Sequence, residues 1–501
     1  MSVYGEFFTK FMEPFFEGLL EIVKGIGRGL GQMFNVVNYV TVVNDYKSDL
    51  TGVGTVIMIL SIILLLALFA VIIFLIYRAV RTYVRYRRNV KKEDRLIEEI
   101  EVLNNEILKL KRQNAKIAEL TNENGEIEYD EEGNVKNELK EGESRFFKLS
   151  SVDAKFKEYT PEEIHNNFTL QELCDLFRNF SASKLGLYYD INLIRLFIAS
   201  FASNKLIILE GISGTGKTSL AYAFGEFTKN ETTVASVQPS WRDSTEIFGY
   251  FNEFTKKFNE TEILEKMYEA QYTDEVYITL LDEMNISRVE YYFAEMLSIL
   301  ELPNKKDWVV ELVPNVWPGD PEKLDEGKLK IPENMWYVGT INNDDSTFMI
   351  TDKVYDRAMP IAIDDKCEAF GAPDTDAVQI SYKYFEGLFD RAEKEHPVTD
   401  ETLEKVAQLD RYVIDHFRLA FGNRIVKQLR EFVPSFVACG GDEVAGIDYL
   451  IAHKILRKFE QLNLAYIKDE IDGLINYLEK LFGTGKTPEC KAYLLRLKKT
   501  I

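Results

Sequence analysis

A glycine-rich segment that could bind phosphate groups lies near the middle of the 501-residue chain. An apolar run at residues 206–209 predicts a buried parallel strand, and a helical pattern follows the glycines. Between the two stands the pattern G-x-x-x-x-G-K-T, at residues 211–218. In this context the backbone N–H groups can surround phosphate oxygens, and the positive end of the following helix strengthens the attraction. The predicted nucleotide-binding residues are Gly211, Ser213, Gly214, Thr215, Gly216, Lys217, Thr218 and Ser219.

The residue types at the end of this segment predict specific roles. Lys217 would neutralise the β- and γ-phosphates, and the Thr218 hydroxyl would bind Mg²⁺. A second apolar run, residues 276–281, ends about 65 residues further on in Asp282 and Glu283. Asp282 would hold the Mg²⁺ shell, and Glu283 would polarise the attacking water. The sequence therefore predicts a hydrolytic nucleotide site with two acids at the tip of a second strand.

A third predicted strand, residues 335–340, leads to Asn342, which could orient the water between the γ-phosphate and Glu283. A second G-T-G-K-T occurs at residues 483–487. Lys480 stands where that copy would need its first glycine, and the residues before it follow a helical pattern. We therefore interpret the second copy as a helix end followed by a turn.

Together these motifs resemble the AAA+ superfamily, in the branch with an insert in the second helix that includes MoxR proteins, midasin, dynein and McrB. The matching segments read GISGTGKT, LLDEMN, FAEMLSILE and GTINNDD, and the resemblance covers roughly residues 170–465. It implies an α/β fold, with a P-loop αβα core and a C-terminal helical lid. It also implies that residues 238–250 belong to the substrate-facing insert.

The resemblance further implies two catalytic arginines and a ring. Arg357 lies where the family carries an arginine finger that acts on a neighbouring subunit, and Arg424 lies where sensor 2 opens a helix. Each could instead be a surface arginine, with Arg357 paired to Asp352 or Asp356. A finger supplied in trans requires an oligomer, and the family implies a homo-hexamer.

Two departures from McrB bear on the choice of nucleotide. Ile286 stands where McrB-type chains carry an arginine, and Arg288 follows two residues later. The loop after the third strand reads INNDD rather than the MNTAD that accompanies GTP preference in McrB. The sequence therefore favours ATP with Mg²⁺, and GTP stays open.

Outside this region, residues 51–77 carry no charge and most of them are apolar, and such a run of about 27 residues is long enough to span a bilayer as a helix. Basic residues crowd its C-terminal side, which predicts that the catalytic part faces the cytoplasm. Heptad spacing from Leu96 to Ile117 favours a short coiled coil over a single packed helix. A second, re-entrant segment near residues 33–43 stays open.

The predicted domains are an extracytoplasmic or interfacial segment at 1–50, a transmembrane helix at 51–78, a basic collar and coiled-coil stalk at 79–121, an acidic linker at 122–170, a nucleotide-binding core at 171–375 and a helical lid at 376–501.

The net charge of −21 does not indicate nucleic-acid binding. The four scattered cysteines predict reduced thiols rather than a zinc site. We expect a membrane-tethered ATPase that remodels a protein partner or activates an effector, and the product of an adjacent gene is one candidate for that partner. The alternatives are an McrB-like GTPase of a defence system and a non-hydrolysing scaffold.

Overall fold

The computed structural model describes residues 142–160, 164–253, 255–342, 347–462 and 464–500, with isolated positions between Gly25 and Arg78. The chain divides into two compact units, Met1–Thr121 and Asn122–Ile501, and the second holds every element considered below. Apart from those isolated positions, the predicted transmembrane helix at 51–78 and the stalk at 79–121 lie outside the described residues. Among the helices that are described, none is both long and apolar enough to cross a bilayer.

A five-stranded parallel sheet forms the centre of the second unit, in the order β10–β1–β9–β5–β2. These strands are β1 (Leu206–Gly211), β2 (Thr233–Ser236), β5 (Tyr277–Asp282), β9 (Met335–Asn342) and β10 (Ala358–Ala362). The sequence placed β1, β5 and β9 correctly, because each is a continuous apolar run and a parallel sheet is buried on both faces. The chain is therefore a mixed α/β protein.

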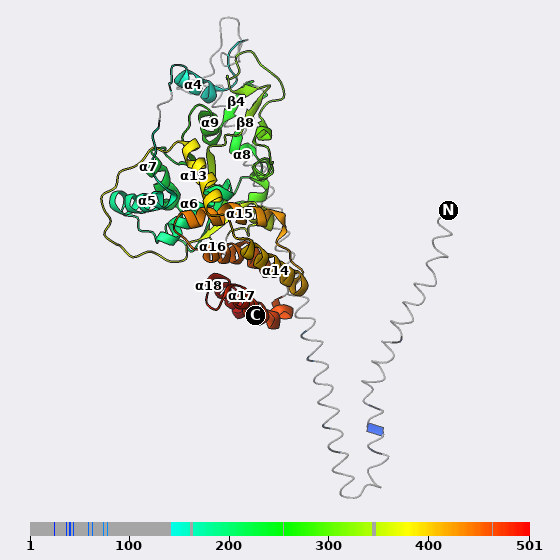
Figure 1. Ribbon diagram of the computed structural model, residues 1–501. Coiled ribbons are helices and arrows are strands. Elements are labelled where there is room, and N and C mark those ends of the chain that lie inside the picture. The colour runs from blue at the N-terminus through cyan, green and yellow to red at the C-terminus, as the bar shows by residue number, and fades with distance from the viewer. Residues whose placement is uncertain are drawn as a thin grey trace, which may run out of the picture. The chain divides into compact units, whose positions relative to one another are not determined.

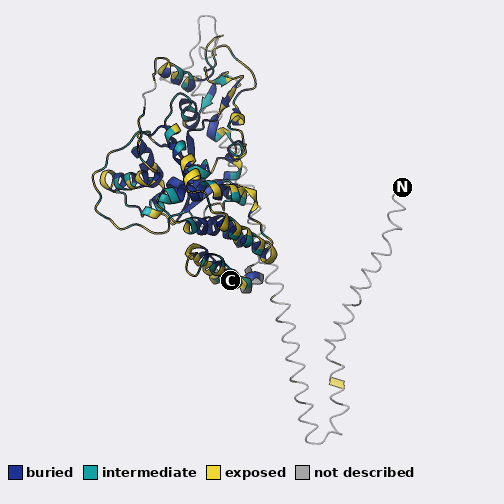
Figure 2. Ribbon diagram, in the orientation of Figure 1, coloured by how far each residue is buried: buried dark blue, intermediate teal, exposed yellow. Residues whose placement is uncertain are grey.

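Both faces of this sheet are covered, which makes a three-layer arrangement (Figure 1). Side chains alternate along a strand, so Leu206 and Ile208 of β1 pack into one core cluster and Ile207 and Leu209 into another. Helices α5, α6, α7 and α13 cover one face, and α4, α8, α9, α10 and α11 contribute to the cluster on the other. Buried residues accordingly fill the centre of the unit (Figure 2).

The helices in the described residues have the following bounds: α4 (Phe147–Phe156), α5 (Leu170–Leu185), α6 (Ile191–Ser203), α7 (Lys217–Thr228), α8 (Thr245–Phe248), α9 (Glu262–Glu269), α10 (Val289–Tyr292), α11 (Ala294–Ile299), α12 (Asp352–Tyr355), α13 (Tyr382–Glu395), α14 (Asp400–Phe417), α15 (Gly422–Ala438), α16 (Glu443–Leu450), α17 (Leu464–Phe482) and α18 (Pro488–Thr500). Short 3₁₀ and π turns are η1 (Met284–Ile286), η2 (Lys305–Asp307), η3 (Ile451–Ile455) and η4 (Leu456–Gln461).

Helices α14 to α18 contribute to a third core cluster; α15 lies beside α6, whereas α14, α16, α17 and α18 lie at the opposite end of the unit from α4 (Figure 1). The second G-T-G-K-T lies in the turn between α17 and α18, and Gly483 takes a positive φ of 105° just after α17 ends. This conformation suits the residue that follows a helix, and it confirms the interpretation of residues 483–487 as a helix end and turn.

Two small antiparallel sheets complete the unit. Strands β3 (Gly249–Phe251) and β4 (Phe258–Glu260) pair as a hairpin within the segment that follows α8. Strands β6 (Val309–Glu311), β7 (Leu324–Asp325) and β8 (Lys328–Lys330) form the other, in the order β6–β8–β7.

The structure differs from the sequence prediction in the region assigned to an acidic linker at 122–170. Helix α4 lies within it, and Phe146, Leu149 and Val152 pack into the core cluster on one face of the sheet. Arg145 also forms a buried ion pair with Asp320, at 2.6 Å. The folded core therefore includes α4, because three buried apolar side chains in its ten residues, together with Phe146 just before it, attach this short helix to the core.

Candidate functional site

The glycine loop, residues 211–218, connects the end of β1 to the first residue of α7. Gly211 has a φ of +144°, and a Cβ there would lie 2.3 Å from the carbonyl oxygen of Ile363. Gly214 also has a positive φ, of +82°, but a Cβ there would meet no atom within 4 Å. The loop is therefore packed tightly at its start and open at its middle, and both conformations require glycine.

Lys217 is buried and folds back over the loop. Its Nζ donates to the carbonyl oxygens of Gly211, at 2.9 Å, and Ile212, at 2.7 Å. Thr218 and Ser213 are exposed on the same loop, and Ser219 is half-buried on the first turn of α7. The ammonium group is thus held at the centre of the loop by the loop's own backbone.

Hydrogen bonds connect the loop to two neighbouring strands. The Thr218 hydroxyl donates to Asp282 Oδ1 at 2.8 Å, and the Thr340 hydroxyl donates to the same oxygen at 2.7 Å. The backbone N–H of Glu283 donates to Thr340 Oγ1 at 2.8 Å. Glu283 itself takes a left-handed backbone conformation, with a φ of 52°, and its side chain is exposed. Thr340, which is buried in β9, therefore positions both acids at the tip of β5.

Asn342 stands at the end of β9, directly beside Gly211 in the register of the sheet. Its side-chain Nδ2 lies 3.4 Å from Glu283 Oε1. Buried Asn285 fixes the backbone here, because its Nδ2 donates to the Asn342 carbonyl oxygen at 2.8 Å. The carboxyl ends of β1, β5 and β9 thus bring together all the strand-tip residues that the sequence predicted.

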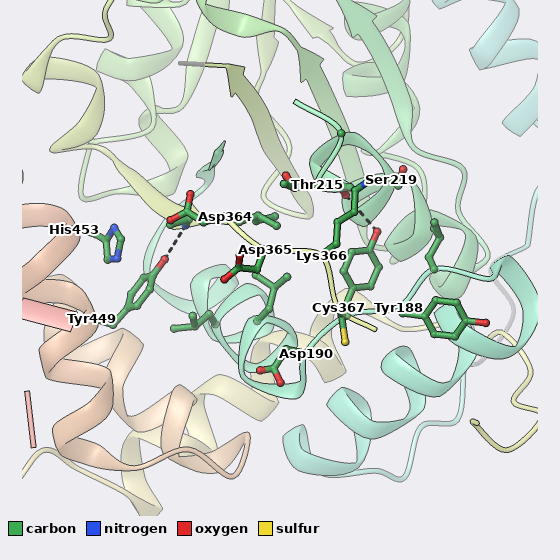
Figure 3. Close-up of a pocket in the computed structure, with 18 of the residues that line it drawn as sticks. Tyr188, Asp190, Thr215, Ser219, Asp364, Asp365, Lys366, Cys367, Tyr449 and His453 are labelled. Carbon is green, nitrogen blue, oxygen red and sulfur yellow. Dashed lines mark hydrogen bonds between the residues drawn. The ribbon is translucent and has the colours of Figure 1, made fainter. Parts of the chain in front are cut away.

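A cavity of about 1120 Å³ opens beside the glycine loop. Its walls come from the segment before α6, from Gly214 to Ser219, from the segment after β10 and from the C-terminal helices. Figure 3 shows the labelled residues around this cavity, with Tyr449 and His453 of the C-terminal helical part on one side and Thr215 and Ser219 of the glycine loop and α7 on another. Ligand cavities in proteins are typically about 300–1,000 Å³, so this one is large enough for a nucleoside.

A second cavity, of about 440 Å³, lies at the other end of the loop. Gly211, Asn285 and Asn342 line it, together with Arg457 and Arg496 from the C-terminal helical part. The two cavities share several lining residues, namely Ala362, Asp364, His453, Tyr493 and Arg496.

Glu210, the residue just before the loop, is buried in a cluster of charged groups. Arg457 contacts its Oε2 at 2.9 Å, and His453 Nδ1 lies 3.7 Å from its Oε1. Burial opposes ionisation, but His453 and Arg457 outweigh it, so that the pKa of the Glu210 carboxyl lies below its usual range. Burial also opposes protonation of His453, yet Glu210 and Glu489 raise the pKa of its ring. This cluster joins the C-terminal helical part to the strand that begins the loop.

The two predicted catalytic arginines, Arg357 and Arg424, lie away from the glycine loop. Arg357 pairs with Glu301 at 2.6 Å, and Arg424 pairs with the other oxygen of the same carboxylate. Because Ala358 is aligned with Leu206, Arg357 sits at the amino edge of the sheet, about 20 Å along the strands from Gly211. The structure therefore does not bring either arginine to the glycine loop of its own chain.

The residues present fit a bound nucleoside triphosphate with Mg²⁺. The open middle of the loop, the buried ammonium of Lys217 and the adjacent cavity match a polyanion with an attached nucleoside. The oxygens of Thr218 and Asp282 are the ligand type that Mg²⁺ uses, and this ion takes only one or two protein ligands beside phosphates. Within the described ranges, no group of three or more histidine, cysteine, aspartate or glutamate side chains could hold a metal.

Sequence reasoning missed Thr340, Asn285 and Arg457. The first two lie within motifs that the sequence did reveal, one before the predicted strand tip and one after the paired acids. Arg457 carries no local signal, because it reaches Glu210 across 247 positions of the chain. No protein-family model matches the chain, and no curated protein matches it either.

Proposed function

We propose that this chain is a P-loop nucleoside triphosphatase of the AAA+ type, with an αβα core and a C-terminal helical lid, and that ATP is its substrate. One observation carries the proposal. A continuous set of hydrogen bonds runs from Thr218 on the glycine loop through Asp282 and Thr340 to Glu283. It arranges a phosphate-binding loop, a Mg²⁺-type ligand pair and a candidate general base at one edge of the sheet.

Each group then has a task in the hydrolysis. Lys217 exchanges its bonds with the loop carbonyls for bonds with phosphate oxygens. Thr218 and Asp282 would hold Mg²⁺, which would supply positive charge to offset that of the phosphates. Glu283 accepts a proton from the attacking water, and Asn342 holds the Glu283 carboxylate in place.

In this proposal, Arg357 and Arg424 act on the nucleotide of a neighbouring copy. They lie at the opposite edge of the sheet from their own loop, and they share Glu301, so they form a single cationic site. A second copy that brings this edge to the first copy's loop would complete the active site, and a closed ring, a homo-hexamer in this proposal, repeats that contact.

The proposal is tested by phosphate release from the full-length protein in detergent, with ATP and GTP measured side by side. The wild type should release phosphate from ATP, and Glu283→Gln should release it at least about a hundredfold more slowly, because it lacks the base. Glu326→Gln is the matched control. Glu326 is also exposed and also has a left-handed backbone, with a φ of 51°, but it lies in the β7–β8 turn.

If the wild type releases phosphate no faster than Glu283→Gln, the chain is not a hydrolase and the scaffold alternative stands. Faster turnover of GTP than of ATP would overturn the choice of adenine and leave the rest of the proposal intact.

The membrane tether and the protein partner are proposals that rest on the sequence alone. The uncharged run at residues 51–77 and the basic residues after it support a single span with the triphosphatase in the cytoplasm. A protease added outside intact cells should then leave residues beyond Arg78 uncut, and cleavage within the triphosphatase would contradict this topology.

A further inference from the structure

Glu301 lies just after α11 and contacts both arginines of the proposed cationic site. Arg357 Nη2 lies 2.6 Å from one oxygen of this carboxylate, and Arg424 Nη2 contacts the other oxygen. The two arginines come from different parts of the chain, since Arg357 immediately precedes β10 and Arg424 lies in the first turn of α15. One carboxylate therefore holds a residue of the core and a residue of the C-terminal helical part together.

Further contacts orient both guanidinium groups beside this shared carboxylate. Arg357 Nη1 donates to the carbonyl oxygen of Lys353 at 2.8 Å. Arg424 Nη1 lies 4.0 Å from Asp356 Oδ2, and the other oxygen of Asp356 pairs with Lys458 at 2.8 Å. Each guanidinium is thus directed by more than one group of its own chain, and opposite charges alternate from the core to the C-terminal helical part.

The positive charges of this group exceed its negative charges. Arg357, Arg424 and Lys458 share the two carboxylates of Glu301 and Asp356. Neither arginine is fully buried, since their side chains are 25% and 42% exposed. A guanidinium has five N–H donors, so each arginine keeps donors that can bind an anion from outside the chain.

The charge of Glu301 is what allows the two guanidiniums to lie close together. Like charges repel at short range, and arginine side chains have many alternative rotamers. Without the carboxylate, both arginines would still be present, but their placement relative to each other would be lost. A partly exposed ion pair contributes little to the stability of a fold, so this loss should leave the fold intact.

We propose that Glu301 is a positioning residue for hydrolysis in a neighbouring copy, because it holds Arg357 and Arg424 as one group that meets the polyphosphate at that copy's glycine loop. This inference rests on the proposed function, and it gives a task to a carboxylate that acts only through the two arginines. Loss of the Glu301 charge should therefore resemble a partial loss of both arginines.

The test measures phosphate release from ATP by the full-length protein in detergent. Glu301→Gln keeps the size of the side chain but not its charge, and its kcat should fall about 10- to 100-fold, the effect of losing one hydrogen bond to a charged group. Glu479→Gln is the matched control and should stay within about twofold of the wild type. Glu479 is also half-buried and pairs with Lys491 at 2.8 Å, but it contacts neither arginine. An unchanged or higher kcat in Glu301→Gln would overturn the proposal.

Mixing two variants separates an effect on the neighbouring copy from a defect within the same chain. Glu301→Gln subunits keep an intact loop, and Lys217→Ala subunits keep intact arginines, so a contact between them should regain part of the activity. A Glu301→Gln defect in its own loop would not be rescued, because the Lys217→Ala loops lack their ammonium group. In a chain that lacks both arginines, adding Glu301→Gln should cause no further loss.

The outcomes distinguish this inference from the proposed function. If the wild type releases no phosphate, the proposed function fails. If Arg357→Ala regains activity on mixing with Lys217→Ala while Glu301→Gln does not, only the role of Glu301 is refuted. Failure of both mixtures refutes action between copies, and this inference with it.

A second variant keeps the test decisive if thermal unfolding shows that Glu301→Gln does not fold. Glu301→Asp keeps the charge but is one methylene group shorter, so it should reach the two arginines less well and lose less activity than Glu301→Gln. The same mixing experiment applies to it, and a Glu301→Asp defect that Lys217→Ala subunits do not rescue would refute the proposal.

Discussion

Thr340→Val removes one hydroxyl group from the centre of the proposed catalytic arrangement and keeps the shape of the side chain. The Thr340 hydroxyl donates to Asp282 Oδ1 at 2.7 Å and accepts from the backbone N–H of Glu283 at 2.8 Å. Valine makes neither bond, and β9 keeps its buried, β-branched residue at this position.

The expected loss of activity in Thr340→Val follows from the free energies of the two hydrogen bonds that the hydroxyl makes. The bond to the carboxylate contributes about 1.5–3 kcal/mol, and the bond from the N–H group about 0.5–1.5 kcal/mol. Asp282 keeps its second bond, from Thr218 at 2.8 Å, so the Mg²⁺ ligand pair is largely retained. Glu283 loses the contact that holds its left-handed backbone, so the loss falls on the orientation of the base. We expect kcat to fall about 10- to 100-fold, or about 1.4–2.7 kcal/mol in activation free energy, with little change in KM.

The assay is steady-state phosphate release with a parallel measurement of thermal stability. Thr340→Ser restores the hydroxyl and should stay within a few-fold of the wild type. Thr279→Val is the matched control, because Thr279 is equally buried in the adjacent β5 but its hydroxyl meets only the Met335 sulfur, at 3.6 Å. A Thr340→Val protein with unchanged kcat, or with a loss no larger than that of Thr279→Val, would refute the argument that this hydroxyl positions the base.

Two further predictions concern other parts of the fold. Burial raises the pKa of Glu431 to about 7, so the folded protein binds this proton more tightly than the unfolded chain and loses stability as the pH rises from about 4.5 to 7. The Glu431→Gln side chain cannot ionise. In thermal unfolding, this variant should be more stable than the wild type at pH 8, by up to about 3 kcal/mol, and equally stable at pH 4. Equal stability of the two proteins at pH 8 would contradict the buried state of this carboxyl. Mixing Arg357→Ala with Lys217→Ala subunits should restore part of the activity that each lacks alone, because an intact arginine then meets an intact loop, and no recovery at any ratio would exclude action between copies.

The strands that carry the site could be predicted because their signals are local. Residues 206–209, 276–281 and 335–340 are apolar runs, and each ends at the polar residues that define the motif. The lateral order β1–β9–β5 was not predicted, because it depends on pairing between distant strands. This order places Asn342 Nδ2 at 3.4 Å from Glu283 Oε1.

The other parts of the fold and of the candidate site could not be predicted from the sequence, because they depend on contacts between segments that are distant in the chain. Arg457 and His453 belong to a stretch whose local sequence pattern indicates only a helix. Their place beside the glycine loop follows from their contacts with Glu210 in β1. The strands of the three-stranded sheet are two or three residues long, which is too short for an alternating pattern to be recognised. The acidic composition around residues 147–156 predicts a linker, whereas the structure has the short helix α4 there, because its apolar side chains pack on a distant part of the chain.

The arrangement of charges also bears on how strongly this site should bind a nucleotide. Lys217 is bonded to two loop carbonyls, and Arg457 is paired with a buried carboxylate. Lys217 would therefore exchange one set of acceptors for another when a polyphosphate binds, and only the difference would contribute to the affinity. The pair between Arg457 and Glu210 adds a constraint of its own, because a guanidinium that moved to the phosphates would leave the buried Glu210 carboxylate with the ring of His453 and the hydroxyl of Tyr355 but without its arginine. Since removing one partner of a buried ion pair is costly, Arg457 should stay with Glu210 when the nucleotide binds.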